Sequence, residues 1–158
     1  MGISIVLYRV GQAEKFEDLV KLEHQLEALD ANSIDLYKMY HDLAIIFTNN
    51  VNPYGNIEAP GYKVLFGNPL RVNVGANEVG GFIPTSEVKK LDDWIKSKSL
   101  NTPQGFIKML RQLSPEVINE LIEIGDHDFM TLYSYVETLA GLYDVAQKEN
   151  NAVIICAE

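Results

Sequence analysis

The chain has 158 residues and a formal net charge of −9 at pH 7, with 47% apolar and 22% charged residues. These values are ordinary for a globular protein, and they exclude a disordered chain, a collagen-like repeat and a disulfide-stapled miniprotein. The length predicts one domain over residues 1–158, because typical domains contain about 100–200 residues.

The charge is distributed unevenly along the chain. Residues 114–158 include nine acidic residues and one basic residue, whereas residues 51–113 include eight basic and five acidic residues. Nucleic-acid binding needs an excess of cations against phosphate, so the sequence predicts no nucleic-acid partner. The acidic last third has two interpretations: a solvated surface that keeps the protein soluble, or a docking surface for a basic protein partner.

The cysteine content and the hydropathy indicate the cellular compartment in which the protein is expected. Cys156 is the only cysteine, which excludes an intrachain disulfide, and its apolar neighbours predict a buried, unreactive thiol. The apolar run from Ile3 to Tyr8 is too short for a signal peptide and follows no basic residue. No stretch reaches the roughly 18 apolar residues of a membrane span. The sequence therefore predicts a cytoplasmic protein with no membrane partner.

The first third of the chain predicts a strand followed by two helices. Ile3–Val10 is rich in β-branched and aromatic residues and ends at Gly11, which is typical of a central strand. Between Gln12 and Leu29, apolar residues recur at helical spacing, with acids near the N-terminal end. Ser33 is expected to cap a second helix. The apolar face of that helix comprises Leu36, Met39, Tyr40, Leu43, Ile46 and Phe47.

The middle of the chain predicts a long loop and two short strands. Asn49–Gly61 is rich in Asn, Gly and Pro, which favours irregular structure. Strands are expected at Tyr62–Phe66 and Val79–Ile83, on either side of Gly67–Gly75.

The second half predicts four helices and a closing strand. Thr85 is expected to cap the first of these helices, and Thr102-Pro103 and Ser114-Pro115 each pair a capping hydroxyl with proline at the first helical position. The longest helix keeps an apolar face for about five turns, from Phe129 to Ala146. Ala152–Ala157 has the composition of a strand.

Strands at both ends with helices between them predict an α/β fold. We expect a three-layer domain in which the N- and C-terminal strands lie in one central mixed sheet, with helices on both faces. No internal repeat or low-complexity segment interrupts this pattern.

The sequence lacks the motifs of two common kinds of site, a phosphate-binding loop and a metal site. Residues 75–81 (GANEVGG) have the glycine spacing of a phosphate-binding loop, but Gly81 and Phe82 replace the required Lys and Ser or Thr. We interpret these glycines as a turn with positive φ before the strand. The three histidines, His24, His41 and His127, lack the spacing of a metal site. The sequence therefore predicts no metal and no cofactor.

The densest polar constellation surrounds His41 on the second predicted helix. Tyr37 lies four residues before His41 and should share its side of the helix. A histidine beside a phenol and acids can act as a general acid or base, with Tyr37 or Tyr40 as its orienting partner. The alternative is a half-buried histidine whose ring nitrogens are satisfied by tyrosine or backbone groups.

A ligand pocket is expected between this helix, the Asn49–Gly61 loop and the Asn68–Arg71 turn. Lys38 or Arg71 would provide the contact for an anion. The candidate ligand-binding residues are Lys38, Asp35, Asn68 and Arg71.

Several short motifs follow one another along nearly the whole chain. They are Ile34–Leu43 with Phe47-Thr48, Met1-Gly2 before a strand, Asn68-Pro69-Leu70 with Gly75, Gly80–Thr85 before a helix, and Leu142-Tyr143 and Ala146 before Asn151–Ile154. In these motifs the chain resembles the YfbM-like family, small bacterial proteins of unknown function. It departs at Tyr40, where the family often has Trp, and at Asn49, which replaces a glycine. The resemblance implies an α/β three-layer fold and supplies no catalytic residues.

Two functions from different classes follow from these observations. The first is protein binding, as an inhibitor or an immunity-type partner of a basic toxin, because the chain is acidic and has no catalytic signature. The second is a small-ligand binder or an enzyme with an acid–base site around His41. These hypotheses leave enzymatic activity open and specify no oligomeric state.

Overall fold

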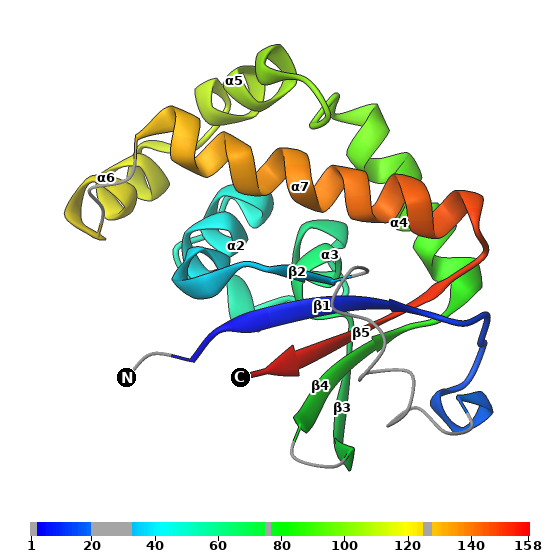
Figure 1. Cartoon of the computed structure of the whole chain (residues 1–158). Helices are drawn as coiled ribbons and strands as arrows, with labels where there is room; N and C mark the ends of the chain where they lie inside the picture. The colour runs from blue at the N-terminus through cyan, green and yellow to red at the C-terminus, as the bar shows by residue number, and fades with distance from the viewer. Residues whose placement is uncertain (1–2, 20–32, 75–76, 125–127) are drawn as a thin grey trace.

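The computed structural model describes residues 3–19, 33–74, 77–124 and 128–158, and confirms the α/β class (Figure 1). The strands in these residues are β1 (Ile5–Val10), β2 (Ser33–Asp35), β3 (Asn68–Val74), β4 (Asn77–Ile83) and β5 (Ala152–Ala157). The α-helices are α2 (Tyr40–Thr48), α3 (Pro60–Phe66), α4 (Thr85–Ser97), α5 (Pro103–Arg111), α6 (Pro115–Ile124) and α7 (Phe129–Lys148). Short 3₁₀ helices are η1 (Phe16–Asp18), η3 (Tyr37–Met39) and η4 (Pro53–Gly55).

The N- and C-terminal strands pair at the centre of one sheet. The strand order is β2-β1-β5-β4-β3, and β1 pairs with β5 from Ile5↔Ala157 to Val10↔Ala152. β5 therefore has a neighbour on each side, and so does β1. The prediction that the terminal strands share a sheet is confirmed.

The sheet is antiparallel rather than mixed, which corrects one detail of the predicted fold. Each pair of neighbouring strands in the described residues runs antiparallel. The β3–β4 connection has only two residues, which suits a hairpin and not a parallel crossover. The chain leaves β4 at Ile83 and returns at Val153, which pairs with Ile83. The intervening helices thus begin and end at the same end of the sheet, so β5 must run against β4.

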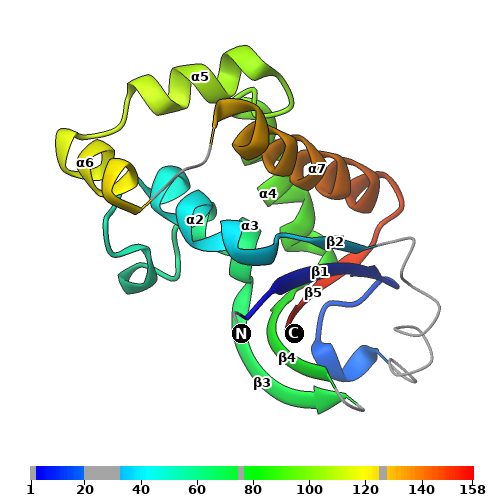
Figure 2. The same ribbon diagram turned by 60° about the vertical axis from the view of Figure 1, so that its left-hand side comes forward.

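Each face of the sheet buries its own apolar cluster, because successive side chains of a strand point to opposite faces. Leu7 and Ile155 pack with the helices, whereas Ile154 and Cys156 pack with residues 11–19. Figures 1 and 2 show α2, α3, α4 and α7 on one side of the sheet and η1 on the other. Within the described residues, α-helices therefore cover one face only.

The second predicted helix begins later than the sequence suggested. Ser33 caps no helix, because Ser33–Asp35 pairs with the edge of β1 as β2. The hydrogen bonds between β2 and β1 satisfy backbone N–H and C=O groups of residues 33–35, so these groups need no helical partner. The helix α2 begins at Tyr40, after η3. Of the helix predicted from Gln12 to Leu29, residues 20–29 lie outside the described residues, and the described part contains η1.

The segment Tyr62–Phe66 is part of helix α3, so the strand predicted there is wrong. Pro60 lies in the first turn of α3, where proline is favoured, and Gly67, with φ 65°, follows its last residue. The strand lies just beyond, as β3, and includes Asn68–Arg71, so the turn expected there is also wrong. A short apolar run does not distinguish helix from strand by periodicity. The strand predicted at Val79–Ile83 is confirmed as part of β4.

Two of the four predicted caps, Thr102 and Ser114, are confirmed. The Thr102 hydroxyl accepts a hydrogen bond from the backbone N–H of Gly105 at 3.1 Å, and Ser114 caps α6 in the same way. Thr85 does not cap α4. Its hydroxyl accepts a hydrogen bond from the backbone N–H of Ala13 at 2.9 Å, which ties residues 11–19 to the start of α4.

Cys156 is buried in β5, as predicted. Its side chain belongs to the cluster that faces residues 11–19. Burial, together with the nearby Glu158 carboxylate, raises the pKa of the thiol to about 12. The reactive thiolate is therefore disfavoured at neutral pH.

Gly81 lies within β4 at a point where the backbone of α3 approaches closely. A Cβ at position 81 would lie 1.9 Å from the carbonyl oxygen of Phe66, whereas a Cβ at Gly80 would meet nothing within 4 Å. The predicted turn with positive φ is wrong for these two residues, since Gly67 alone among the described glycines has positive φ. Gly81 is needed for close packing instead.

We predict that Gly81→Ala lowers the free energy of unfolding by about 1–3 kcal/mol, because the added methyl group forces α3 away from the sheet. Urea unfolding monitored by circular dichroism measures this change. Gly80→Ala is the matched control, with the same chemistry one residue away, and it should leave the unfolding free energy nearly unchanged. Equal losses in the two variants would contradict the packing role of Gly81.

Candidate functional site

His41 lies at the start of α2 and pairs with a tyrosine from the loop that follows this helix. Its Nδ1 is 2.8 Å from the hydroxyl of Tyr54, and the two rings stack with centroids 5.8 Å apart and an interplanar angle of 17°. Tyr54 belongs to η4, inside the Asn49–Gly61 loop. The imidazole is half-buried. The contact holds the ring in one orientation, which a positioned acid–base group requires.

The orienting partner of His41 is Tyr54, and not Tyr37 or Tyr40 as the sequence suggested. Tyr37 has φ 49° and lies in η3, and its ring meets Tyr135 of α7 at a centroid distance of 6.4 Å. Tyr40 turns toward α3. The expected helical spacing fails because α2 begins only at Tyr40, so Tyr37 and His41 do not share one regular helix.

The ring of Phe66 joins three tyrosines beside His41. Its centroid lies 6.1 Å from that of Tyr40, 5.7 Å from that of Tyr54 and 4.8 Å from that of Tyr62. Aromatic contacts of this kind fix ring positions in addition to burying apolar area. The loop residue Tyr54 is therefore held against both α2 and α3.

The environment keeps the Tyr54 phenol protonated. Burial raises its pKa, and Tyr40, Tyr62 and Asp42 raise it further. Burial also raises the pKa of Tyr62. A protonated phenol can donate a hydrogen bond to Nδ1 of a neutral His41, whose proton then lies on Nε2. The arrangement can present an oriented imidazole N–H to a ligand.

Asp35 and Lys38 flank this cluster on the N-terminal side. Asp35 accepts hydrogen bonds from the backbone N–H of Tyr37, at 2.7 Å, and from the hydroxyl of Ser4. These bonds stabilise the turn between β2 and η3. Lys38 is exposed on η3. The ligand-binding role of both residues stays a prediction.

Asn68 and Arg71 lie on β3 and bond to residues of β4 and α4. The side-chain amide of Asn68 donates to Oε2 of Glu87 at 2.7 Å and to the carbonyl of Phe82 at 3.2 Å. Arg71 is 93% exposed, with its Nε 3.8 Å from Oε1 of Glu78. These contacts hold the β3–β4 hairpin, and a role in ligand binding stays a prediction for both residues.

Glu87 also pairs with Lys63, which sequence reasoning did not single out. The Lys63 ammonium lies 2.8 Å from Glu87 Oε1 and 3.2 Å from Glu58 Oε2. Burial alone would raise the pKa of Glu87, but the hydrogen bonds from Lys63 and Asn68 outweigh it and lower the pKa. The cluster joins α3, β3 and α4, and its opposite charges satisfy one another.

Two isoleucines one turn apart on α6 are exposed to solvent. Ile122 is 72% exposed and Ile118 is 40% exposed, whereas Val117 faces the core. Figures 1 and 2 show α6 at one end of the molecule, away from the sheet. The helix has no basic residue. We call the following five residues the α6 surface: Ile118, Ile122, Glu116, Glu120 and Glu123.

A pocket of about 260 Å³ lies between α4 and α7. Its lining residues are Asp92, Ile95, Lys96, Asn101, Glu137, Ala140, Gly141 and Asp144. Asp92 is buried on the apolar face of α4, beside Val88, Leu91 and Ile95. Sequence reasoning missed it, although an acid on the apolar face of an amphipathic helix is a usable signal. A larger hollow of about 420 Å³ beside α5 is lined mainly by exposed polar side chains.

Among the described residues, no group of three or more His, Cys, Asp or Glu side chains is placed to hold a metal ion. In the same part of the chain, no helix has the length and apolar character needed to cross a membrane. His24 and His127 lie outside the described residues. The expectation of no metal or cofactor stays a prediction.

A comparison with solved structures assigns the fold. The crystal structure of YfbM from Escherichia coli, a protein of unknown function, superimposes with a TM-score of 0.64 over 98% of this chain and 99% of that chain. This chain has a YfbM-like fold. The two sequences are 15% identical, so the likeness concerns the fold, and it confirms the resemblance in the sequence motifs at that level. No protein-family model and no curated protein matches the sequence.

Proposed function

We propose that the protein acts by binding another protein, and that the α6 surface receives a basic partner with an apolar contact residue. The observation that carries this proposal is the 72% exposure of Ile122 within a helix that also holds three glutamates. Interfaces combine a desolvated apolar centre with a polar rim. The α6 surface offers both elements on a single helix.

The negative charge of the last third of the chain supports a positively charged partner. Residues 114–158 include nine acidic residues and one basic residue, and α6 itself has only acidic charges. Such a surface attracts a basic protein over about one Debye length, roughly 8 Å at physiological ionic strength. Long-range attraction raises the association rate, and like charges repel an acidic protein or a nucleic acid.

Among protein-binding functions, that of an inhibitor or an immunity-type module suits the chain best. A small acidic protein can block a basic toxin by covering its cationic surface. The single buried cysteine suits a reducing compartment, so we place this function in the cytoplasm.

The test uses a partner recovered from the source cell at low salt, identified by mass spectrometry and then purified. Calorimetry with this protein should show that Ile122→Ser weakens binding about tenfold or more, because the loss of an interface anchor costs at least about 1.4 kcal/mol. Ile57→Ser is the matched control, since Ile57 is 40% exposed outside α6. Added salt should also lower the association rate. An acidic partner, or equal affinity for the Ile122 variant, contradicts the proposal.

A second candidate function is ligand binding with His41 as the acid–base group, and the hydrogen bond between His41 and Tyr54 favours it. Because Tyr54 engages Nδ1, Nε2 is the ring nitrogen available to a ligand. Lys38, exposed on η3, supplies a positive charge three residues before His41. Together, an imidazole N–H and an ammonium suit an anion.

Inorganic phosphate is the probe for this site. We predict that phosphate shifts the amide NMR signals of residues around His41, and that His41→Gln abolishes these shifts without changing the melting temperature. Tyr54→Phe keeps the ring and removes the hydroxyl, and it should weaken phosphate binding about 2- to 10-fold, as expected for one lost hydrogen bond. Unchanged shifts in His41→Gln, or a collapse of its stability, would assign His41 to packing.

A further inference from the structure

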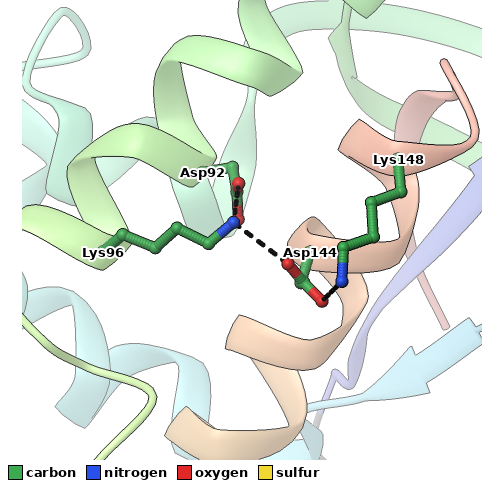
Figure 3. Close-up of polar contacts among 4 residues, drawn as sticks. All are labelled: Asp92, Lys96, Asp144 and Lys148. Atoms are coloured by element: carbon green, nitrogen blue, oxygen red, sulfur yellow. Dashed lines mark hydrogen bonds and ion pairs between the residues drawn. The ribbon is translucent and has the colours of Figure 1, made fainter.

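Four charged side chains form a chain across α4 and α7 (Figure 3). The Lys96 ammonium lies 2.7 Å from Asp92 Oδ2 and 3.0 Å from Asp144 Oδ1, and Lys148 lies 2.9 Å from Asp144 Oδ2. Both oxygens of Asp144 thus have a cationic partner. Asp92 uses only one of its two carboxylate oxygens in this series of ion pairs.

The second oxygen of Asp92, Oδ1, is buried and has no hydrogen-bond partner in the part of the chain that the structure describes. The Asp92 side chain is only 2% exposed. A carboxylate oxygen enclosed away from water normally accepts a hydrogen bond, because desolvation without a donor is costly. The missing donor therefore points to a group that the described residues do not supply.

The pocket beside Asp92 has the charge and the walls for a small organic cation. Its charged lining residues are three acids, Asp92, Glu137 and Asp144, and one base, Lys96. This excess of negative charge disfavours anions. Its apolar wall gives a carbon-bearing ligand a contact surface that an inorganic cation would not use. The wall residues are Ile95, Ala140 and Gly141.

We propose that the pocket between α4 and α7 binds a guanidinium group. A guanidinium donates two parallel N–H groups and engages both oxygens of Asp92, whereas the Lys96 ammonium engages one. Lys96 occupies the position of the ligand in this structure. Its side chain is 46% exposed, so it has room to turn outward when the guanidinium enters between Asp92 and Asp144. The site lies on α4 and α7, and is independent of the α6 surface.

The guanidinium group can come from a free small molecule or from an arginine side chain of a protein. Two probes distinguish these sources: n-butylguanidinium, and an N-acetylated, C-amidated Ala-Arg-Ala peptide. Binding of n-butylguanidinium alone assigns a free ligand. Binding of both assigns a site open to an arginine side chain, and binding of neither overturns the proposal.

Calorimetry with n-butylguanidinium and the full chain is the direct test. Asp92→Asn should weaken binding about tenfold or more, because it removes the charge and one of the two acceptor oxygens. Asp93→Asn is the matched control, since Asp93 is exposed on the same helix and outside the pocket lining, and it should bind as the wild type does. Equal affinities of the two variants would overturn the proposal.

Two further variants keep the test decisive if Asp92→Asn fails to fold. A Cβ on Gly141 meets nothing within 4 Å, so Gly141→Leu should fold and fill the pocket, and binding should be lost. Lys96→Ala removes the internal occupant, and n-butylguanidinium at millimolar concentration should raise the melting temperature of this variant more than that of the wild type. Undiminished binding by Gly141→Leu, or no rise for Lys96→Ala, would contradict the assignment.

Discussion

The pairing of β1 with β5 is the interaction on which the rest of the structure depends. It joins the two ends of the described chain over the full length of both strands, from Ile5↔Ala157 to Val10↔Ala152. Because both strands lie inside the sheet, their alternating side chains feed two apolar clusters, one against the helices and one against residues 11–19. Loss of this pairing would expose both clusters at once, so folding of the two sides is coupled through a single pair of strands.

The same arrangement positions the surfaces that carry the functional proposals. The helices between β4 and β5 leave and return at one end of the sheet, which packs α4 beside α7 and encloses Asp92 between them. α6 lies in the middle of this helical segment. Figure 1 shows it far from the sheet, and its residues Ile118 and Ile122 are exposed to solvent. Packing against the core accounts for the apolar faces of α4 and α7. It does not account for the buried acid Asp92 or for the exposed apolar side chain of Ile122.

The sequence predicted those features that neighbouring residues determine. The caps at Thr102 and Ser114 and the β-branched run Ala152–Ala157 are local signals, and the structure confirms them. Tyr62–Phe66 is an apolar run too short for its period to decide between strand and helix. The contact of His41 with Tyr54 joins a helix to a loop, and the unpartnered oxygen of Asp92 exists only once α7 covers α4. Both depend on tertiary packing, which periodicity and capping rules do not contain.

Native-state amide hydrogen exchange tests the central role of the terminal strands most directly. We expect the backbone amides of β5 and of the paired residues of β1 to exchange slowest in the protein, with an opening free energy equal to that of global unfolding. Amides of α5 and α6, at the periphery, should open at lower free energy. Fast exchange in β1 or β5 while the helices remain protected would show that the fold does not depend on the pairing of these two strands.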